Sequence, residues 1–513
     1  MSGLPRALRD AVAAGLIALA MFLAFGHAFL NYDSFYALVW GDELVRWRQP
    51  QYDLSVAPTP HPLATFVGAL VSPLGDSAED VLLAIVLLSV GYIGVGLYRL
   101  GRELYVWPVG LLAAGIVLTR VPPLNFGIRG YVDLPTVALI VWAAVLEARR
   151  PRRGVPVLLL LGLAGLLRPE AWLFAVAYWV WLVVPVERWG PLARLLQRPA
   201  SEHSPREPPP PVAGATRLRL AALALAAPLV WSLTDLLVTG DPLWSLHGTG
   251  DLARELERPT GLDNLPEILP RRLGENLRLP ELIAAVLGFA LGMAWLKRRT
   301  LLPAALAVLN GLTFCVFAAF ELPLLGRYLF LAGSMLALFA GLAAFGWLAL
   351  DQGHPWRLRW LVLGLAVLGA MLAFAPSQAN RLSDLRQDIR ARDRIQADLL
   401  DLARSPAGEK ALEQCGPIYV PNHRPVPVLA YWTGRRPREI VPNFGEPAVN
   451  GVFVEPANAE VERLSILDPR DPAERRARGR PPQYRRLLAA NRSWRIWSGG
   501  CPPRVEPRVE PAK

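Results

Sequence analysis

The stretch YLFLAGSMLALFAGLAAFGWLA, residues 328–349, contains no charged side chain. About 20 apolar residues in a helix can cross the hydrocarbon core of a bilayer, because a helix satisfies its backbone hydrogen bonds internally. The stretch therefore predicts a transmembrane helix. Ten further apolar runs predict ten more, and the full set is 11–30, 81–98, 106–119, 134–147, 155–167, 171–186, 218–238, 281–296, 301–320, 328–349 and 359–376.

The composition agrees with a polytopic α-helical membrane protein of about 11 transmembrane helices. The 513 residues are 53% apolar and 19% charged, whereas average soluble proteins are about 25% charged. The net charge is +11, but the basic residues fall in short clusters between apolar runs and form no patch interleaved with stacking aromatics. We therefore expect the lipid bilayer as a partner and no nucleic acid.

Arginine clusters follow every second predicted span. They lie at Arg99 and Arg102, 149–153, 188–219, 297–299, and Arg357 and Arg359. Because cytoplasmic loops carry the excess of Lys and Arg, this parity predicts a multi-pass protein of the plasma (inner) membrane with a cytoplasmic N-terminus. An odd number of spans then puts the C-terminus outside. The first run is long and contains no small-x-small cleavage site, so we expect an uncleaved span and not a signal peptide.

Two domains are predicted. Residues 1–376 form the transmembrane domain, with a first outer loop at 31–62 and a cytoplasmic flexible linker at 190–217 that contains four consecutive prolines. From 377 to 513 the hydropathy falls, and a helical pattern leads into short β-like runs. This predicts a small C-terminal α/β extracytoplasmic domain, with the β-like runs at 417–420, 439–441, 452–454 and 494–497.

Three cysteines are too few for a disulfide scaffold, and none has the spacing of a zinc site. Cys415 and Cys501 both belong to the predicted outer domain, where an oxidising compartment allows a disulfide. The sequence leaves this bond open, because it does not supply the Cα distance that a disulfide requires. Cys315 lies within a predicted span, where inert packing is expected.

The first outer loop, NYDSFYALVWGDELVRWRQPQYDLSVAPTPHP, is rich in acids and aromatics. Asp33 follows the first span directly, and a carboxylate at the membrane boundary suits general-base work, the alternative being a helix cap. Asp42 belongs to a short predicted helix, either as a site residue or on its solvated face. Asp53 lies in an extended segment, and His61 is held extended by a proline on each side, which either builds a site or only shapes the loop.

Ionisable residues also gather at the outer ends of later spans. Arg129 and Asp133 lie in NFGIRGYVDLP, where they either pair with each other or mark a site near the hydrocarbon. Arg168 and Glu170 lie together in LLRPEAW.

Two more candidates lie in later outer segments. Arg327 is followed by Tyr328 in PLLGRYLF, and arginine binds phosphate in a bidentate fork, the alternative being snorkelling to the interface. His247 belongs to a long outer loop that we expect to line the same cavity. The chain contains no Gly-rich phosphate or dinucleotide motif, no GxSxG and no HExxH.

Taken together, these motifs resemble the GT-C superfamily of integral-membrane glycosyltransferases, which includes the protein O-mannosyltransferase and aminoarabinose transferase families. The resemblance covers roughly residues 11–376. It rests on the C-terminal outer domain and on the motifs YDSFYALVWGDEL, QYDL, TPHPLATF, RGYVDLP, LLRPEAW and GRYL.

This resemblance implies transfer of a sugar from a polyprenyl-phosphate donor to an extracytoplasmic glycan, lipid or protein acceptor. In such families an acid of the first outer loop is the catalytic base, which implies this role for Asp33. The common Asp-Glu pattern occurs here only at Asp42, which is the reserve, and Asp53 is the third acidic candidate. A divalent cation is possible, because some members use one and others do not.

The implied chemistry is a single displacement with inversion at the anomeric carbon. The base removes a proton from the acceptor hydroxyl, and arginines at the outer boundary stabilise the departing phosphate. Two alternatives remain. A transporter or flippase would have a similar number of spans, although it should show two related halves with helices broken near the midplane. A noncatalytic scaffold would bind a cell-wall partner through the outer domain.

Overall fold

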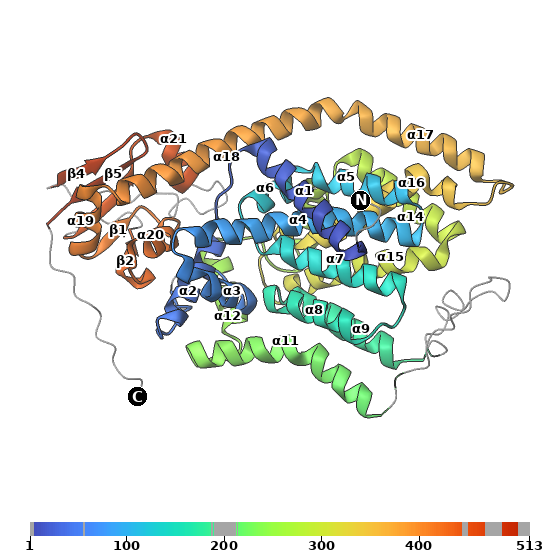
Figure 1. Ribbon diagram of the computed structural model, residues 1–513, viewed down its shortest axis with the longest axis horizontal. Coiled ribbons are helices and arrows are strands. Elements are labelled where there is room, and N and C mark those ends of the chain that lie inside the picture. Colours follow the sequence, from blue (N-terminus) through green and yellow to red (C-terminus); the bar gives the residue numbers. More distant parts are fainter. Residues whose placement is uncertain are drawn as a thin grey trace.

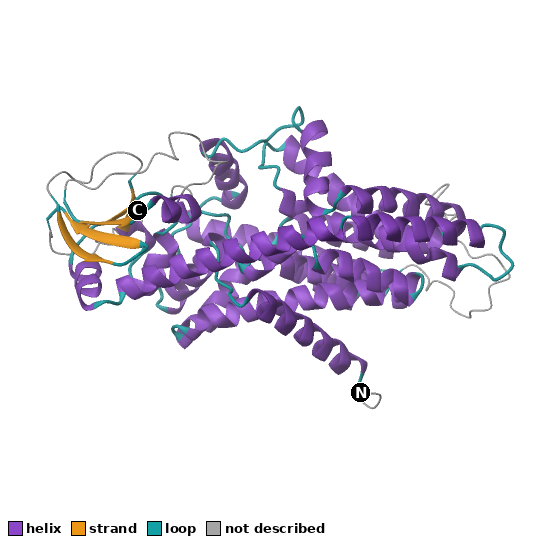
Figure 2. Cartoon of the chain, turned by 90° about the horizontal axis from the view of Figure 1, so that it is seen from above, coloured by secondary structure: helices purple, strands orange, loops and turns teal. Residues whose placement is uncertain are grey.

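The computed structural model describes residues 5–54, 57–185, 188, 212, 214–443, 450–466 and 485–500. These residues are mostly helical, and a long helical bundle carries a small sheet at one end (Figure 1, Figure 2). The prediction of a polytopic α-helical protein with a small C-terminal α/β domain is therefore confirmed.

Each of the eleven predicted spans coincides with a helix. The helices are α1 (Arg6–Phe25), α4 (Ser77–Leu104), α5 (Trp107–Leu118), α7 (Asp133–Arg149), α8 (Val155–Leu167), α9 (Glu170–Val183), α11 (Ala215–Thr239), α14 (Leu279–Trp295), α15 (Lys297–Ala319), α16 (Phe330–Phe345) and α17 (Arg357–Ala373).

Within the described residues, five helices are long and apolar enough to cross a membrane by themselves, or eight spans if each of three bent helix pairs is counted as one. The first five are α1, α4, α11, α15 and the helix that includes α16. The chain is thus a multi-pass membrane protein, while the number eleven stays a prediction.

Shorter helices and one long one lie outside the predicted spans. They are α2 (Tyr32–Val45), α3 (Pro62–Val71), α6 (Val121–Ile128), α12 (Trp244–Glu255), α13 (Leu265–Asn276), the 3₁₀ turn η3 (Gly326–Leu329) and α18 (Ala375–Ala403). In Figure 1, α18 continues from α17 along one edge of the bundle and reaches the sheet.

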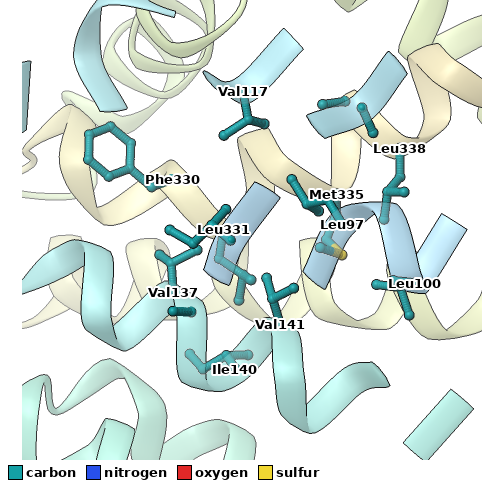
Figure 3. Close-up of a cluster of buried hydrophobic side chains, with 14 of the residues drawn as sticks. Leu97, Leu100, Val117, Val137, Ile140, Val141, Phe330, Leu331, Met335 and Leu338 are labelled. Atoms are coloured by element: carbon teal, nitrogen blue, oxygen red, sulfur yellow. The ribbon is translucent and has the colours of Figure 1, made fainter. Parts of the chain in front are cut away.

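The core of the bundle surrounds α16, almost all of whose residues are buried. Figure 3 shows Met335 and Leu338 of this helix among side chains of α4, α5 and α7, including Leu97 and Val141. Glycines let the helices approach closely: a Cβ at Gly341 would overlap the backbone of Val109 in α5. Small residues at helix contacts are the usual means of close packing in membranes.

The C-terminal domain, called the outer domain after its predicted location, holds a five-stranded sheet in the order β2-β1-β3-β5-β4. Its strands are β1 (Ile418–Val420), β2 (Ile440–Pro442), β3 (Val452–Pro456), β4 (Arg486–Ala490) and β5 (Trp494–Ser498). β1 runs parallel to both β2 and β3, and the remaining pairs are antiparallel. Four strands coincide with the predicted β-like runs, and β4 was not predicted. Helices α19 (Pro406–Gln414), α20 (Val426–Thr433) and α21 (Ala459–Val461) complete the domain.

The first outer loop carries the surface on which this domain rests. Arg436 donates to buried Glu43 at 3.0 Å, and Arg438 pairs with Asp53 at 2.8 Å. Tyr431, on α20, donates its hydroxyl to the carbonyl of Gly75 at 2.9 Å. Asp53, an acid that the sequence assigned to a site, therefore joins the two parts of the molecule, as does Glu43.

Cys415 forms a disulfide bond, and Cys315 is free and half-buried within α15. Cys501, the other half of the predicted pair, lies outside the described residues. Most of the predicted linker, up to residue 211, also lies outside them, and α11 begins at Ala215 within its last few residues.

Candidate active site

A cavity of about 1070 Å³ opens between the helical bundle and the outer domain. Six of the predicted site residues line it: Asp33, His61, Arg129, Arg168, Arg327 and Tyr328. Its walls come from α2, the segment before α3, α6, α12, α13, η3, α18 and the loop after β1. Segments far apart in the chain therefore meet at one site.

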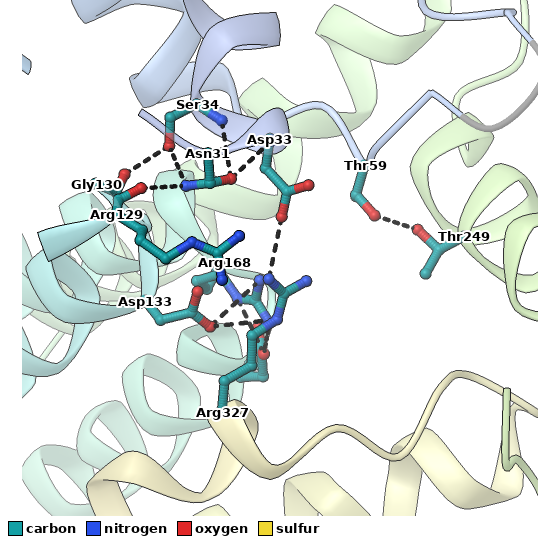
Figure 4. A network of polar contacts seen from close by, with 11 residues as sticks. Asn31, Asp33, Ser34, Thr59, Arg129, Gly130, Asp133, Arg168, Thr249 and Arg327 are labelled. Carbon is teal, nitrogen blue, oxygen red and sulfur yellow. Dashed lines mark hydrogen bonds and ion pairs between the residues drawn. The ribbon is translucent and has the colours of Figure 1, made fainter. Parts of the chain in front are cut away.

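Asp33 is fixed by the way α2 begins. The side chain of Asn31 caps the helix, accepting from the backbone N–H of Asp33 at 2.7 Å, and it also donates to the carbonyl of Arg129 at 2.8 Å. Ser34 donates to the carbonyl of Gly130 at 2.5 Å (Figure 4). An Asn cap of this kind contributes about 1 kcal/mol to helix stability. The cap thus ties the first turn of α2 to the turn between α6 and α7.

Five charged side chains form a continuous ion-pair cluster at the wall of the cavity (Figure 4). Arg327 Nη1 donates to Asp33 Oδ2 at 3.0 Å, and its Nε lies 3.9 Å from Asp133 Oδ1. Arg168 Nη1 lies 3.6 Å from the same Asp133 oxygen, and its Nη2 donates to Glu170 at 2.7 Å. Asp133 therefore joins the two arginines without lining the cavity itself.

Aromatic rings support these arginines from the side. The guanidinium of Arg168 lies 4.5 Å from the ring centre of Tyr328, and that of Arg327 lies 5.4 Å from Tyr131. Arg129 lies 5.5 Å from the same Tyr131 ring and 5.8 Å from Phe29. Such contacts hold a planar cation in one orientation while its charge stays available to a ligand.

The cavity walls are positively charged. Eight arginines and four acids line it, which gives a net charge of +4 with both histidines neutral. Buried polar atoms without a hydrogen-bond partner include Nε of Arg129 and of Arg327 and Nδ1 of His61. Buried donors are normally satisfied, so these atoms are suited to an anionic or hydroxyl-bearing ligand.

His61 precedes α3 and is 7% exposed. Its ring meets the indole of Trp231 edge to face, with ring centres 5.9 Å apart. Burial, and secondarily the charges of Arg168 and Arg327, lower the pKa of His61 well below its usual value. The imidazole is therefore neutral at physiological pH and can bind a hydroxyl without adding charge.

Three predicted residues lie away from the cavity. Asp42 pairs with Arg46 one turn later on α2 at 2.7 Å, and Asp53 pairs with Arg438 with both side chains more than half exposed. The side chain of His247 is 57% exposed, and its Nδ1 lies 2.6 Å from Oδ2 of Asp241. The helix that carries His247 does reach the cavity, through Thr249, whose hydroxyl lies 2.5 Å from that of Thr59.

Several lining residues were not predicted from the sequence. His423 and Arg424 come from the loop after β1 in the outer domain, and the ring of His423 packs edge to face on Tyr32 beside Asp33. Arg272 comes from α13 and Asp388 from α18. No local motif marks any of them, because they reach the site only through long-range packing.

Within the described ranges, no group of three or more His, Cys, Asp or Glu side chains could hold a metal ion.

No known protein-family profile and no curated protein sequence matches this chain. Its fold, however, is similar to solved structures. The crystal structure of ArnT from Cupriavidus metallidurans bound to undecaprenyl phosphate aligns with a TM-score of 0.53 at 14% identity, covering 95% of this chain and 97% of ArnT. The Archaeoglobus fulgidus oligosaccharyltransferase complex with Zn and sulfate aligns with a TM-score of 0.49 at 12% identity, covering 90% of this chain and 70% of that one. The chain thus shares the fold of ArnT, a member of the GT-C superfamily of integral-membrane glycosyltransferases.

Proposed function

We propose that this protein is a membrane glycosyltransferase that moves a sugar from a polyprenyl-phosphate donor to an extracytoplasmic acceptor. The observation that carries the proposal is the pairing of Asp33 with Arg327 inside a large, positively charged cavity at the ends of predicted spans. The similar ArnT structure holds undecaprenyl phosphate, which supports a lipid phosphate as the donor's carrier. The outer side of the plasma membrane is the compartment that the loop charges favour.

Asp33 is the proposed general base. Its Oδ2 accepts from Arg327, which leaves Oδ1 for the acceptor hydroxyl. As the acceptor oxygen forms its bond to the anomeric carbon, its proton moves to Asp33, and the bond between that carbon and the phosphate oxygen breaks. The electron pair leaves with the phosphate, so the products are the glycosylated acceptor and the polyprenyl phosphate.

The arginines of the cluster are proposed to stabilise the departing phosphate. Phosphate needs charge compensation more than a proton as it leaves, and fixed cations in a site shielded from water supply it without reorganisation. Arg327 is suited to align base and leaving group together, because it already contacts Asp33. Arg129 and Arg168 add charge, and their aromatic supports limit how far they move.

A single displacement of this kind inverts the anomeric carbon. Retaining glycosidases use a second carboxylate about 5 Å from the first as a nucleophile. Here the other two carboxylates of the cluster, Asp133 and Glu170, are both engaged by Arg168 and do not line the cavity. The arrangement therefore favours inversion.

The test compares Asp33→Asn with Asp42→Asn in membranes that contain equal amounts of protein. A panel of polyprenyl-phosphate sugars serves as donors, and transfer into endogenous acceptors is measured. Loss of the base should lower transfer by about 10²–10⁴-fold. Asp42→Asn is the matched control, because it removes an acid of the same helix that pairs only with Arg46 outside the cavity.

The outcomes test both the identity of the base and the class of function. Transfer that survives in Asp33→Asn and is lost in Asp42→Asn would move the base to Asp42. Absence of transfer by the wild-type protein with every donor would contradict the glycosyltransferase proposal and favour a transporter, flippase or scaffold.

A further inference from the structure

Within the part of the chain that the structure describes, three apolar helix pairs are bent by more than 40°, and the three breaks meet at one place. The bends are 64° between α5 and α6, 102° between α13 and α14, and 41° between α17 and α18. In each case a proline lies in the first turn after the break, at Pro122, Pro280 and Pro376. Proline is tolerated there and ends the preceding helix, so the sequence itself fixes where each helix bends.

Arg120 links all three breaks. It lies at the α5–α6 break, donates through Nη1 to Gln378 at 2.8 Å, and donates through Nη2 to Glu281. Gln378 in turn donates to the carbonyl of Thr119 at 2.6 Å, which satisfies a carbonyl that the break leaves open. Arg120, Glu281 and Gln378 are all less than 9% exposed.

Arg278 makes a second link between two of the same breaks. Its Nη1 donates to the carbonyl of Phe374 at 3.1 Å, and its Nη2 donates to Ser377 at 3.0 Å. The α13–α14 and α17–α18 breaks are thus joined twice, and the α5–α6 break is joined to them through Arg120.

The segments that extend from these breaks are walls of the cavity. α6 contributes Asn125 and Phe126, α13 contributes Arg272 and Asn276, and α18 contributes Asp388. Neither Asp33, on α2, nor Arg327, on η3, belongs to these three segments. The segments do contact the neighbours of both residues, because Asn31 joins α2 to the residue that follows α6 and Asn276 of α13 donates to the carbonyl of Gly326 at 2.9 Å. A change at the junction should therefore alter the walls most and the proposed base and its partner less.

We propose that Arg120 is a positioning residue that fixes the width of the cavity by joining the three broken helices, and that it thereby sets the affinity for the polyprenyl-phosphate donor. The effect on donor affinity rests on the proposed function, whereas the effect on the width of the cavity does not. An arginine suits this position because its rigid planar fork offers two separate nitrogens to the two acceptors, whereas the donors of a lysine all lie on one nitrogen at the end of a flexible chain.

The first measurement is a distance between spin labels and needs no activity. In a Cys315→Ala background, exposed residues of α13 and α18 are labelled through Glu267→Cys and Gln387→Cys. We expect a narrow distance distribution in the parent protein, a broad one with Arg120→Gln, and an intermediate one with Arg120→Lys. Gln378→Met, which removes the contact of Arg120 with α18 and leaves that of Arg278, should also broaden it and serves if Arg120→Gln does not fold.

Arg99→Gln is the matched control. Arg99 is another arginine with little exposure (14% of its side chain), paired with Asp10 between α1 and α4, and it touches none of the three breaks. Its loss should leave the distribution narrow. An unchanged distribution in both Arg120→Gln and Gln378→Met, or equal broadening in Arg99→Gln, would overturn the proposed junction.

The second measurement separates KM from kcat in the transfer assay. Misplaced walls should raise the donor KM about tenfold in Arg120→Gln with a smaller fall in kcat, because the proposed base and its partner lie on other segments, which contact the ends of α6 and α13. Partial recovery of KM by Arg120→Lys is expected. A fall in kcat with unchanged KM would contradict the role in affinity, and a wild-type protein without transfer would contradict the proposed function while the label distances still test the junction.

Discussion

Arg327 is the residue at which the two sides of the ion-pair cluster meet. It contacts Asp33 through Nη1 and approaches Asp133 through Nε, while Tyr131 and Tyr328 flank its guanidinium. A lysine could supply the same charge, but it has neither a fork for two partners nor a planar face for the rings. The orientation of this cation should therefore matter as much as its charge.

We expect Arg327→Lys to lower kcat by about 10²-fold and Arg327→Gln by about 10³-fold, with smaller changes in KM, because the interaction is proposed to strengthen in the transition state. The control is Arg271→Lys at the cavity rim, where the side chain is 67% exposed and lies 3.7 Å from Glu275. Steady-state transfer kinetics provide the measurement. Full kcat in Arg327→Lys would show that charge alone suffices.

His61 gives a prediction about pH. Because burial lowers its pKa in the folded protein, His61 stays neutral where an unfolded chain protonates it, below about pH 6.5. The unfolded state then binds the extra proton, so the free energy of unfolding should fall with decreasing pH by up to about 1.4 kcal/mol per unit. His61→Gln should remove this dependence, as measured by thermal unfolding in detergent between pH 5 and 7. Parallel curves for the two proteins would contradict the assignment.

The residues that could be predicted from the sequence share one property. Asp33, Arg129, Arg168 and Arg327 all lie at the ends of apolar runs, where a charge is costly and stands out from its neighbours. His423 has no such signal, because its position in the cavity depends on how the outer domain packs on α2. Asp42 shows the reverse case, since an acid in a promising loop forms an ordinary pair with the next turn of its helix.

At the scale of elements, α2 connects the site to the outer domain. Its first turn carries Asp33, and its last turns carry Glu43, which pairs with Arg436. Close contact with α3 fixes the helix between these ends, since a Cβ at Gly41 or Gly68 would overlap the backbone of the other helix. Movement of the outer domain and movement of the proposed base are therefore linked through one short helix.

The pairing of Glu43 with Arg436 should stabilise the docked domain. Burial raises the pKa of Glu43, and Arg436 opposes this shift, so removal of the arginine leaves a buried carboxyl without its main partner. We expect Arg436→Gln to lower the free energy of unfolding by about 2 kcal/mol. This is less than the roughly 3–5 kcal/mol for breaking a fully buried pair, because Arg436 is partly exposed. Thermal unfolding and protease cleavage between the domains are the measurements.

Arg438→Gln is the control for this prediction. Its pair with Asp53 joins the same two parts of the molecule, but both side chains are more than half exposed. Exposed ion pairs contribute about 0–1 kcal/mol to the free energy of unfolding, so Arg438→Gln should be nearly as stable as the wild type. Equal destabilisation by the two substitutions would mean that burial does not distinguish them.

Elements were predictable where their signal is local. Apolar runs located the helices of the bundle, and β-branched runs located β1, β2 and β3. β4 has the sequence RLLAA with half-exposed side chains, and its pairing with β5 defines it as a strand. The bends were not predicted either, because hydropathy does not register the direction of a helix after a proline.

For the molecule as a whole, contacts between distant residues restrict how the helices cross a membrane. Two residues in contact lie at the same level, so an even number of crossings separates them. Glu103 and Arg149 pair at 2.9 Å, and therefore α7 must cross back if α5 crosses. Asp133 and Arg168 pair at 3.6 Å, and only α7 and α8 lie between them in the sequence. If α7 crosses the membrane, α8 must therefore cross back.

The same reasoning reaches α9. The indole nitrogen of Trp244 lies 3.3 Å from the carbonyl of Tyr52. In the sequence between these two residues, the crossing helices counted so far are α4, α5, α7, α8 and α11. An even number requires that α9 cross as well. If the bent α5–α6 pair crosses once, α7, α8 and α9 therefore cross as well and add to the eight spans that length and composition allow. Under that condition the contacts agree with the prediction of eleven spans, while the loop arginines predict which side is cytoplasmic.

Labelling of single cysteines in a Cys315→Ala background tests this topology. Arg150, in the loop between α7 and α8, and Asp251, on α12, are both exposed. With eleven spans and a cytoplasmic N-terminus, a membrane-impermeant maleimide should label Asp251→Cys in intact cells and Arg150→Cys only after permeabilisation, relative to the unsubstituted background. Labelling of Arg150→Cys from outside would mean that α7 does not cross. That result would place Glu103 and Arg149 on opposite sides of the membrane, which is incompatible with their ion pair. External labelling of Arg150→Cys would therefore contradict that pair, and protection of Arg150→Cys until permeabilisation would agree with it.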